Sequence, residues 1–131
     1  MAIDQCRETR SMGSPEPADQ QEQLWSLYAA FNRRDVAAVL AALAPDVSWP
    51  TGWEGGSVRG HDQVRAYWRR QWAAIDPVVV PTAFHTEDDG RVTVTAHQVV
   101  RTRQGAVIAD QVVTHVYRFA GGLIVDMAIQ D

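Results

Sequence analysis

Apolar residues recur at helical spacing in the segment that begins at Ala18. They repeat every three or four positions, at Leu24, Leu27, Tyr28 and Phe31. This spacing places the apolar side chains on one face and predicts an amphipathic helix. Polar residues interrupt the pattern at Asn32-Arg33-Arg34, and we expect the helix to end there.

Two further helices are predicted in the first half of the chain. Asp35 is a favourable N-cap for a helix over VAAVLAAL, which Pro45 should end. The segment DVSWP then predicts a short strand, followed by a glycine-rich loop from Thr51 to Arg59. Helical spacing resumes from about Gly60 to Ala74. Its apolar side consists of Val64, Tyr67, Trp68 and Trp72.

After Pro77 the pattern changes to alternating strands separated by short turns. Turns are predicted at Asp88-Asp89-Gly90, Gln104-Gly105 and Gly121-Gly122, because such pairs supply the positive φ of tight hairpins. The element order is therefore α-α-β-α-β-β-β-β, an α+β fold. Three N-terminal helices can cover one face of such a sheet, and long twisted strands curl. We expect a cone-shaped, curved antiparallel sheet that wraps around the helices and encloses a pocket.

Valines occupy both faces of the predicted long strands, at Val99, Val100, Val112 and Val116. Neighbouring strand residues point in opposite directions, so these side chains cannot all enter one pocket. We expect a homodimer that covers the outer face of the sheet.

The composition describes an ordinary globular domain. The chain has 131 residues, 46% of them hydrophobic, which suits one domain, predicted over residues 18–131. Residues 1–17 lack apolar periodicity and are predicted to be a disordered arm; Met12 is an alternative start. A net charge of −4 argues against nucleic acid as a partner. No apolar run is long enough to span a membrane. Cys6 is the single cysteine, and we expect a cytoplasmic protein.

Four of the five tryptophans fall between Asp46 and Trp72. We interpret this aromatic cluster as the wall of the pocket and the glycine-rich loop as its mobile lip. Trp49, Trp53 and Trp68 are then substrate-binding residues, although core packing is the competing explanation for each.

Three segments carry a resemblance to a known family: YAAFNRRDVAAVLAALAPDVSW, VRGHDQVRAYW and THVYRFAGGLIVD. In this order they resemble the nuclear transport factor 2-like superfamily, and within it the SnoaL-like polyketide cyclases and the ketosteroid isomerases. The resemblance covers Ala18 to Asp131. It implies the cone fold and acid/base chemistry without a cofactor on a hydrophobic substrate, which can be cyclic, by isomerisation, cyclisation, hydrolysis or dehydration. A non-catalytic ligand-binding or dimerisation module is the alternative.

The family's functional positions match this sequence unevenly. The carboxylate base of the isomerases falls at Thr51, which cannot take that role. Their oxyanion tyrosine falls at Leu27, with Tyr28 one step around the helix. In the cyclases a strand histidine matches His115, and the acid/base aspartate falls at Ile129. Asp131 lies two residues further on and shares that strand face by the period of two.

The resemblance therefore suggests His115 and Asp131 as catalytic residues. We expect His115 to be buried and neutral at pH 7, with Tyr28, Gln98 or Asp131 as its hydrogen-bond neighbour. The substrate-binding set comprises Tyr28, Trp49, Trp53, Trp68, His97, Met127 and Ile129. An acid or a tyrosine hydroxyl within reach of His115 would favour the enzyme over the binding module.

His97 depends on a register that the sequence leaves open. A two-residue and a three-residue loop at Gln104-Gly105 place opposite faces of strand 91–103 beside His115. His85, His97 and His115 fall on successive strands, but no close-set ligand pair such as HxH accompanies them. We therefore expect no metal site.

Overall fold

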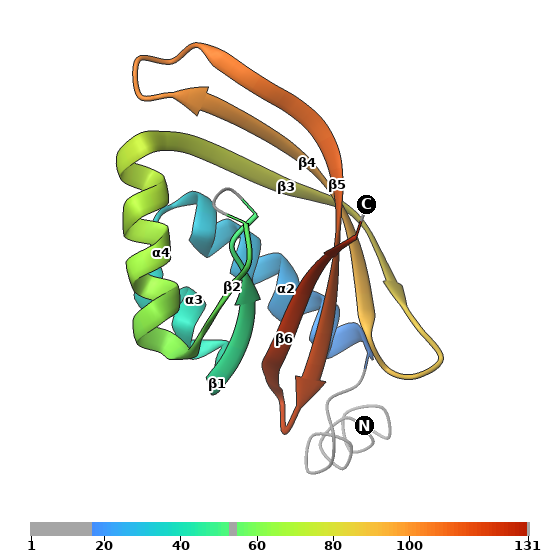
Figure 1. Cartoon of the computed structure of the whole chain (residues 1–131). Coiled ribbons are helices and arrows are strands. Elements are labelled where there is room, and N and C mark those ends of the chain that lie inside the picture. The colour runs from blue at the N-terminus through green and yellow to red at the C-terminus, as the bar shows by residue number, and fades with distance from the viewer. Residues whose placement is uncertain (1–16, 53–54, 131) are drawn as a thin grey trace, which may run out of the picture.

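The computed structural model describes residues 17–52 and 55–130 (Figure 1). The predicted arm, apart from Pro17, and the residues Trp53, Glu54 and Asp131 lie outside this description. The helices are α2 (Pro17–Asn32), α3 (Val36–Ala41) and α4 (Gly60–Ala74). The strands are β1 (Leu43–Pro50), β2 (Ser57–Arg59), β3 (Ile75–Thr86), β4 (Val92–Thr102), β5 (Val107–Ala120) and β6 (Leu123–Gln130).

The six strands form one curved sheet in the order β2-β1-β6-β5-β4-β3. Every neighbouring pair is antiparallel except β1 and β6, which run parallel. The helices lie together on the concave side of the long strands β3, β4 and β5 (Figure 1). The predicted α+β fold is confirmed, with one parallel pair that the sequence did not indicate and without closure of the sheet.

The second helix is shorter than predicted. Asp35 caps α3 as expected, because its Oδ1 accepts a hydrogen bond of 3.2 Å from the Ala38 N–H. The helix nevertheless ends at Ala41, and β1 begins at Leu43, before Pro45. The Ile124 N–H donates to the Ala42 carbonyl at 3.0 Å, and Leu43 pairs with Ile124. Pairing with β6 thus overrides the helical preference of this alanine-rich segment.

The glycine-rich loop is also more regular than predicted. Its last three residues form β2, which pairs with Ser48, Trp49 and Pro50. The Thr51 N–H donates to the Gly56 carbonyl at 2.9 Å, and the Thr51 hydroxyl donates to the Gly55 carbonyl at 2.9 Å. The other described residues of the loop therefore belong to the turn of a β1–β2 hairpin.

The β4–β5 turn settles the register that the sequence left open. Val100 pairs with Ala109, whereas Arg101 pairs with Val107, so Ile108 is an extra residue in β5. Gly105 takes the positive φ of 101° that the turn requires. His115 then lies opposite Val94, which is fully buried. The even-numbered residues of β4 consequently face the helices, and the odd-numbered residues face outward.

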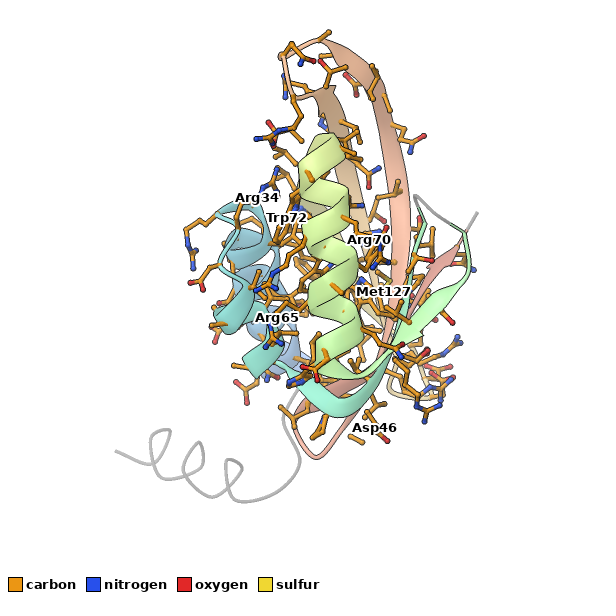
Figure 2. All side chains as sticks on the ribbon, turned by 60° about the vertical axis from the view of Figure 1, so that its left-hand side comes forward. Arg34, Asp46, Arg65, Arg70, Trp72 and Met127 are labelled. Carbon is orange, nitrogen blue, oxygen red and sulfur yellow. The ribbon has the colours of Figure 1, made fainter. Side chains whose placement is uncertain are left out.

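Arg34 fixes the connection between α2 and α3 against α4. Its φ of 65° is left-handed, which ends α2 abruptly. Its guanidinium pairs with Asp76 and lies over the Trp72 ring, 5.1 Å from the centroid. Figure 2 shows Arg34 and Trp72 together beside one end of α4. This contact holds the helices in place above the sheet.

Candidate functional site

A cavity of about 770 Å³ lies between the helices and the concave face of the sheet. Its walls come from α2, α3, α4 and all six strands, and most of the lining side chains are apolar. The ring of Trp68 is almost completely buried there and meets Trp49 edge-on, with centroids 5.6 Å apart. Figure 2 shows Met127, a wall residue of β6, beside α4. The volume and the apolar lining are those of a small-molecule site.

A chain of three polar side chains crosses this apolar wall. Tyr28, on α2, has its hydroxyl 2.7 Å from Nδ1 of His115, on β5. The Tyr117 hydroxyl donates to the Tyr28 hydroxyl at 2.8 Å. His115 and Tyr117 face the same way because they are two residues apart on one strand. All three side chains are buried.

Burial keeps all three groups uncharged at neutral pH. Desolvation lowers the pKa of His115 to about 4, because an apolar cavity disfavours the imidazolium. Desolvation also raises the pKa of Tyr28 well above its usual value, and the neighbouring Tyr117 raises it further. Burial likewise raises the pKa of Tyr117. His115 is therefore neutral at pH 7, as its place on an apolar strand suggested.

The two tyrosine protons determine the tautomer of His115. Tyr117 donates a hydrogen bond to the Tyr28 hydroxyl. The Tyr28 hydroxyl can therefore donate its own hydrogen bond only to Nδ1 of His115. A proton on Nδ1 would instead leave one tyrosine hydroxyl hydrogen without an acceptor, which is costly in a buried site. The neutral ring therefore carries its proton on Nε2. His115 can offer a hydrogen-bond donor to a molecule in the cavity.

The structure brings together most of the predicted substrate-binding residues. Tyr28, Trp49, Trp68, Met127 and Ile129 all line the cavity with His115. The expected Trp53 and Asp131 lie outside the described residues.

His97 does not belong to this site. It lies on the outer face of the sheet, where its Nε2 is 2.6 Å from Asp110 Oδ1. The reason is the register of β4: Gln98, its neighbour, faces the cavity instead.

Several cavity residues were not identified from the sequence as site residues. Tyr117 could have been found by counting two positions from His115 along the strand. Gln98 and Gln111 required the β4–β5 register, since they are directly opposite each other across that pair. Gln71, on α4, donates from Nε2 to the Tyr67 hydroxyl at 3.1 Å, and its orientation follows from the docking of α4.

Thr51, at the position of the isomerase base, is used structurally. It is 3% exposed, and its hydroxyl is committed to the Gly55 carbonyl. It is not one of the cavity-lining residues. Steroid isomerisation by a carboxylate at this position is therefore not available to the chain.

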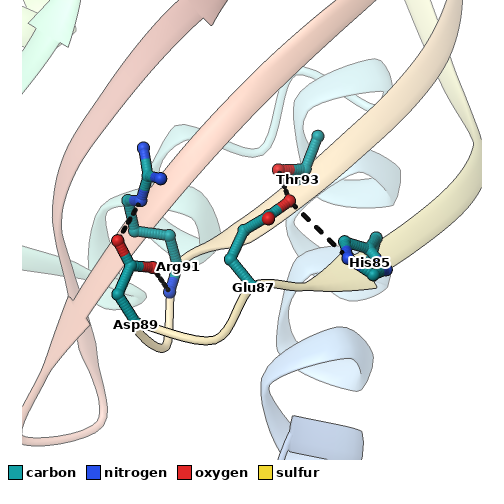
Figure 3. A network of polar contacts seen from close by, with 5 residues as sticks. All are labelled: His85, Glu87, Asp89, Arg91 and Thr93. Carbon is teal, nitrogen blue, oxygen red and sulfur yellow. Dashed lines mark hydrogen bonds and ion pairs between the residues drawn. The ribbon is translucent and has the colours of Figure 1, made fainter.

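The other histidines are dispersed. His85 lies near the β3–β4 turn, where its Nε2 is 3.8 Å from a Glu87 oxygen that also accepts from the Thr93 hydroxyl (Figure 3). Asp89 and Arg91 pair across the same turn. Within residues 17–52 and 55–130, no three histidine, cysteine, aspartate or glutamate side chains gather in a way that could hold a metal ion. Among these residues, no helix combines the length and apolarity needed to cross a membrane.

Solved structures share this architecture. An NTF2-like protein of unknown function from Burkholderia pseudomallei is 32% identical, with a TM-score of 0.74 over 84% of this chain and 88% of that one. TerC, crystallised with polyporic acid, is 25% identical, with a TM-score of 0.73 over 83% and 88% of the two chains. A Mycobacterium tuberculosis protein in complex with estradiol-17β-hemisuccinate is 19% identical, with a TM-score of 0.72 over 83% and 90%.

The family assignment rests on sequence as well as on fold. No curated protein matches the chain. The family model of the SnoaL-like domain, however, matches residues 26–127, which include all three members of the Tyr117–Tyr28–His115 chain. The chain is therefore a SnoaL-like protein with the nuclear transport factor 2-like fold.

Proposed function

We propose that this protein binds a hydrophobic, ring-containing small molecule and catalyses acid/base chemistry next to a carbonyl group of that molecule. The observation that carries the proposal is the uncharged chain Tyr117–Tyr28–His115, which ends inside an apolar cavity. A tyrosine hydroxyl within hydrogen-bond reach of His115 distinguishes this cavity from a purely apolar one.

The role of His115 follows from its tautomer. When a proton leaves the carbon beside a carbonyl, the C–H electrons form a C=C bond and the carbonyl oxygen takes the negative charge. A hydrogen bond from Nε2–H of His115 stabilises that oxygen, and the surrounding apolar rings exclude competing water. Tyr28 is a positioning residue, because its hydroxyl holds the imidazole orientation through Nδ1.

A proton acceptor is also needed. Among the described residues, no carboxylate lines the cavity. We propose Asp131 for this role, because it follows Ile129 by two residues and Ile129 lines the cavity opposite His115.

The test uses a panel of cyclic ketones in deuterium oxide. NMR measures deuterium uptake at the carbon beside the carbonyl, and quenching of tryptophan fluorescence measures binding. We expect the His115→Ala variant to lose exchange by about 100-fold, the usual cost of removing one oxyanion donor. Its affinity for apolar ketones should stay within a few-fold of wild type. Asp131→Asn should also abolish exchange without weakening binding.

The matched control is His97→Ala, which removes a histidine from the outer face of the same sheet. It should exchange and bind like the wild type. Exchange that is unchanged in His115→Ala would contradict the catalytic role.

The second candidate function is a non-catalytic ligand carrier. It is favoured by the lack of a lining carboxylate within the described part of the chain. For a carrier, the wild-type protein would bind ketones from the panel and leave their deuterium content unchanged.

We also propose that two copies associate through the outer face of the sheet. Val80, His97 and Val112 are in register across β3, β4 and β5, and the two valines are 45% and 70% exposed. A second copy would remove these two valines from water.

A further inference from the structure

The cavity has a second polar group of residues, distant from His115. Gln98 on β4 and Gln111 on β5 are directly opposite each other in the sheet, and both line the cavity. Their side-chain amides have no hydrogen-bond partner among the described residues. Each amide can donate and accept.

Apolar side chains separate the two polar groups. Val113 lies between Gln111 and His115 on β5, and Ala96 lies between Gln98 and Val94 on β4. Gln111 and His115 are four residues apart on one strand, which corresponds to about 13 Å between their Cα atoms. The cavity wall thus presents a donor at His115, then an apolar stretch, then a pair of amides, and Ile108 and Ala109 continue the wall beyond them.

Resting on the proposed function, we infer that the ligand is an elongated, rigid ring system with oxygen atoms at both ends. Its carbonyl oxygen contacts Nε2–H of His115, and a hydroxyl or second carbonyl at the far end contacts Gln98 and Gln111. These two glutamines select the ligand by the presence and the distance of its second oxygen.

The ligand group that contacts Gln98 and Gln111 is neutral rather than charged. Among the described residues that line the cavity, none is an arginine. The lining therefore offers no cationic partner to a carboxylate or phosphate at the far end of the ligand. An amide pair instead suits a hydroxyl, because one amide accepts from it while the other donates to it.

The test compares testosterone with the analogue that lacks only its far hydroxyl group. Both are rigid and carry a ketone at one end, so they differ only in the group that should meet the glutamines. Binding is measured by titration calorimetry. We expect the wild-type protein to bind testosterone about fivefold to tenfold more tightly, as one additional neutral hydrogen bond would give.

The variants Gln98→Leu and Gln111→Leu keep a side chain of similar size and remove the amide. Each should reduce the preference for the hydroxylated probe, and the double variant should bind the two probes equally. The matched control is Gln104→Leu, in the exposed β4–β5 turn, which should keep the full preference. Circular dichroism at increasing temperature checks that each variant is folded, and Gln111, which is exposed, can be replaced without loss of core packing.

Equal affinity of the wild type for both probes, or no binding of either, would overturn this inference. His115→Ala separates this inference from the proposed function, because both probes carry the ketone. That variant should weaken the binding of both probes by the same small factor, within a few-fold, and preserve the ratio of their affinities. If the wild-type protein shows deuterium exchange but no preference for the hydroxylated probe, only the role of the two glutamines is contradicted, and the proposed function stands.

Discussion

His115 illustrates how one buried side chain links the chemistry of the cavity to the stability of the protein. Its pKa falls from 6.5 to about 4 on folding, because burial disfavours the charged ring. Between these two pH values the unfolded chain binds a proton that the folded protein does not. The contribution of His115 to stability is therefore complete above pH 6.5 and is lost as the pH falls toward 4.

We predict that the titration of His115 alone lowers the unfolding free energy of the wild-type protein by about 3 kcal/mol between pH 7 and pH 4. Urea unfolding at several pH values measures the effect. His115→Gln should show a correspondingly smaller loss, because glutamine does not titrate. If the unfolding free energy falls equally with pH in the wild type and in His115→Gln, the loss does not come from His115.

For this single residue, the sequence allowed burial and neutrality of His115 to be predicted, but not its hydrogen-bond partner. Tyr28, Gln98 and Asp131 were equally eligible, because the choice depends on how α2 docks on the sheet. The side chain of Tyr28 reaches Nδ1 only through this docking. The direction of the hydrogen bond was not predictable either: an imidazole that accepts at Nδ1 is a donor toward the cavity.

Among the elements, β3 is the edge strand that lies against α2, and Asn32 of α2 forms hydrogen bonds to its backbone. The Asn32 side chain donates to the Val79 carbonyl at 2.8 Å and accepts from the Val79 N–H at 3.0 Å. Both backbone groups would otherwise be unpaired on the open edge. Asn32 thus acts as a short substitute for a neighbouring strand.

We predict that Asn32→Ala lowers the unfolding free energy by about 1 to 3 kcal/mol, because two partly buried backbone groups lose their partner. Chemical denaturation measures the loss. Asn32→Asp retains the acceptor for the Val79 N–H but turns a carboxylate oxygen toward the Val79 carbonyl, so it should not restore the stability of the wild type. An alanine variant as stable as wild type would show that water replaces both hydrogen bonds without cost.

The helices and the hairpins were predictable because their signals are local. Asp35 marked the start of α3, and Gly90 and Gly105 marked tight turns with positive φ. The early start of β1 and the strand β2 were not predictable, because both depend on partners elsewhere in the chain. Leu43 becomes a strand residue only when Ile124 of β6 lies beside it.

The whole molecule presents one face of its sheet to the helices and the other to its surroundings. The proposed homodimer would cover Val112, which is 70% exposed at the middle of the outer face. We predict that Val112→Lys shifts the protein from dimer to monomer, because an ammonium group would be buried without a partner. Light scattering coupled to gel filtration measures the mass.

The control for this experiment is Ala29→Lys, which places the same charge on an exposed position of α2, away from the outer face of the sheet. It should remain dimeric. A wild-type protein that elutes as a monomer at micromolar concentration would rule out the proposed dimer, whatever the variants do.

The parallel pairing of β1 with β6 also has a consequence for how the chain folds. The hairpins from β3 to β6 join neighbouring segments and can form early, whereas β1 must wait for a strand near the other end of the chain. Closing such a long loop costs entropy and slows folding. Trp49 lies on β1, so we expect the aromatic wall of the cavity to be assembled late. On the ribosome, a nascent chain cannot capture a ligand until β6 has emerged and joined β1.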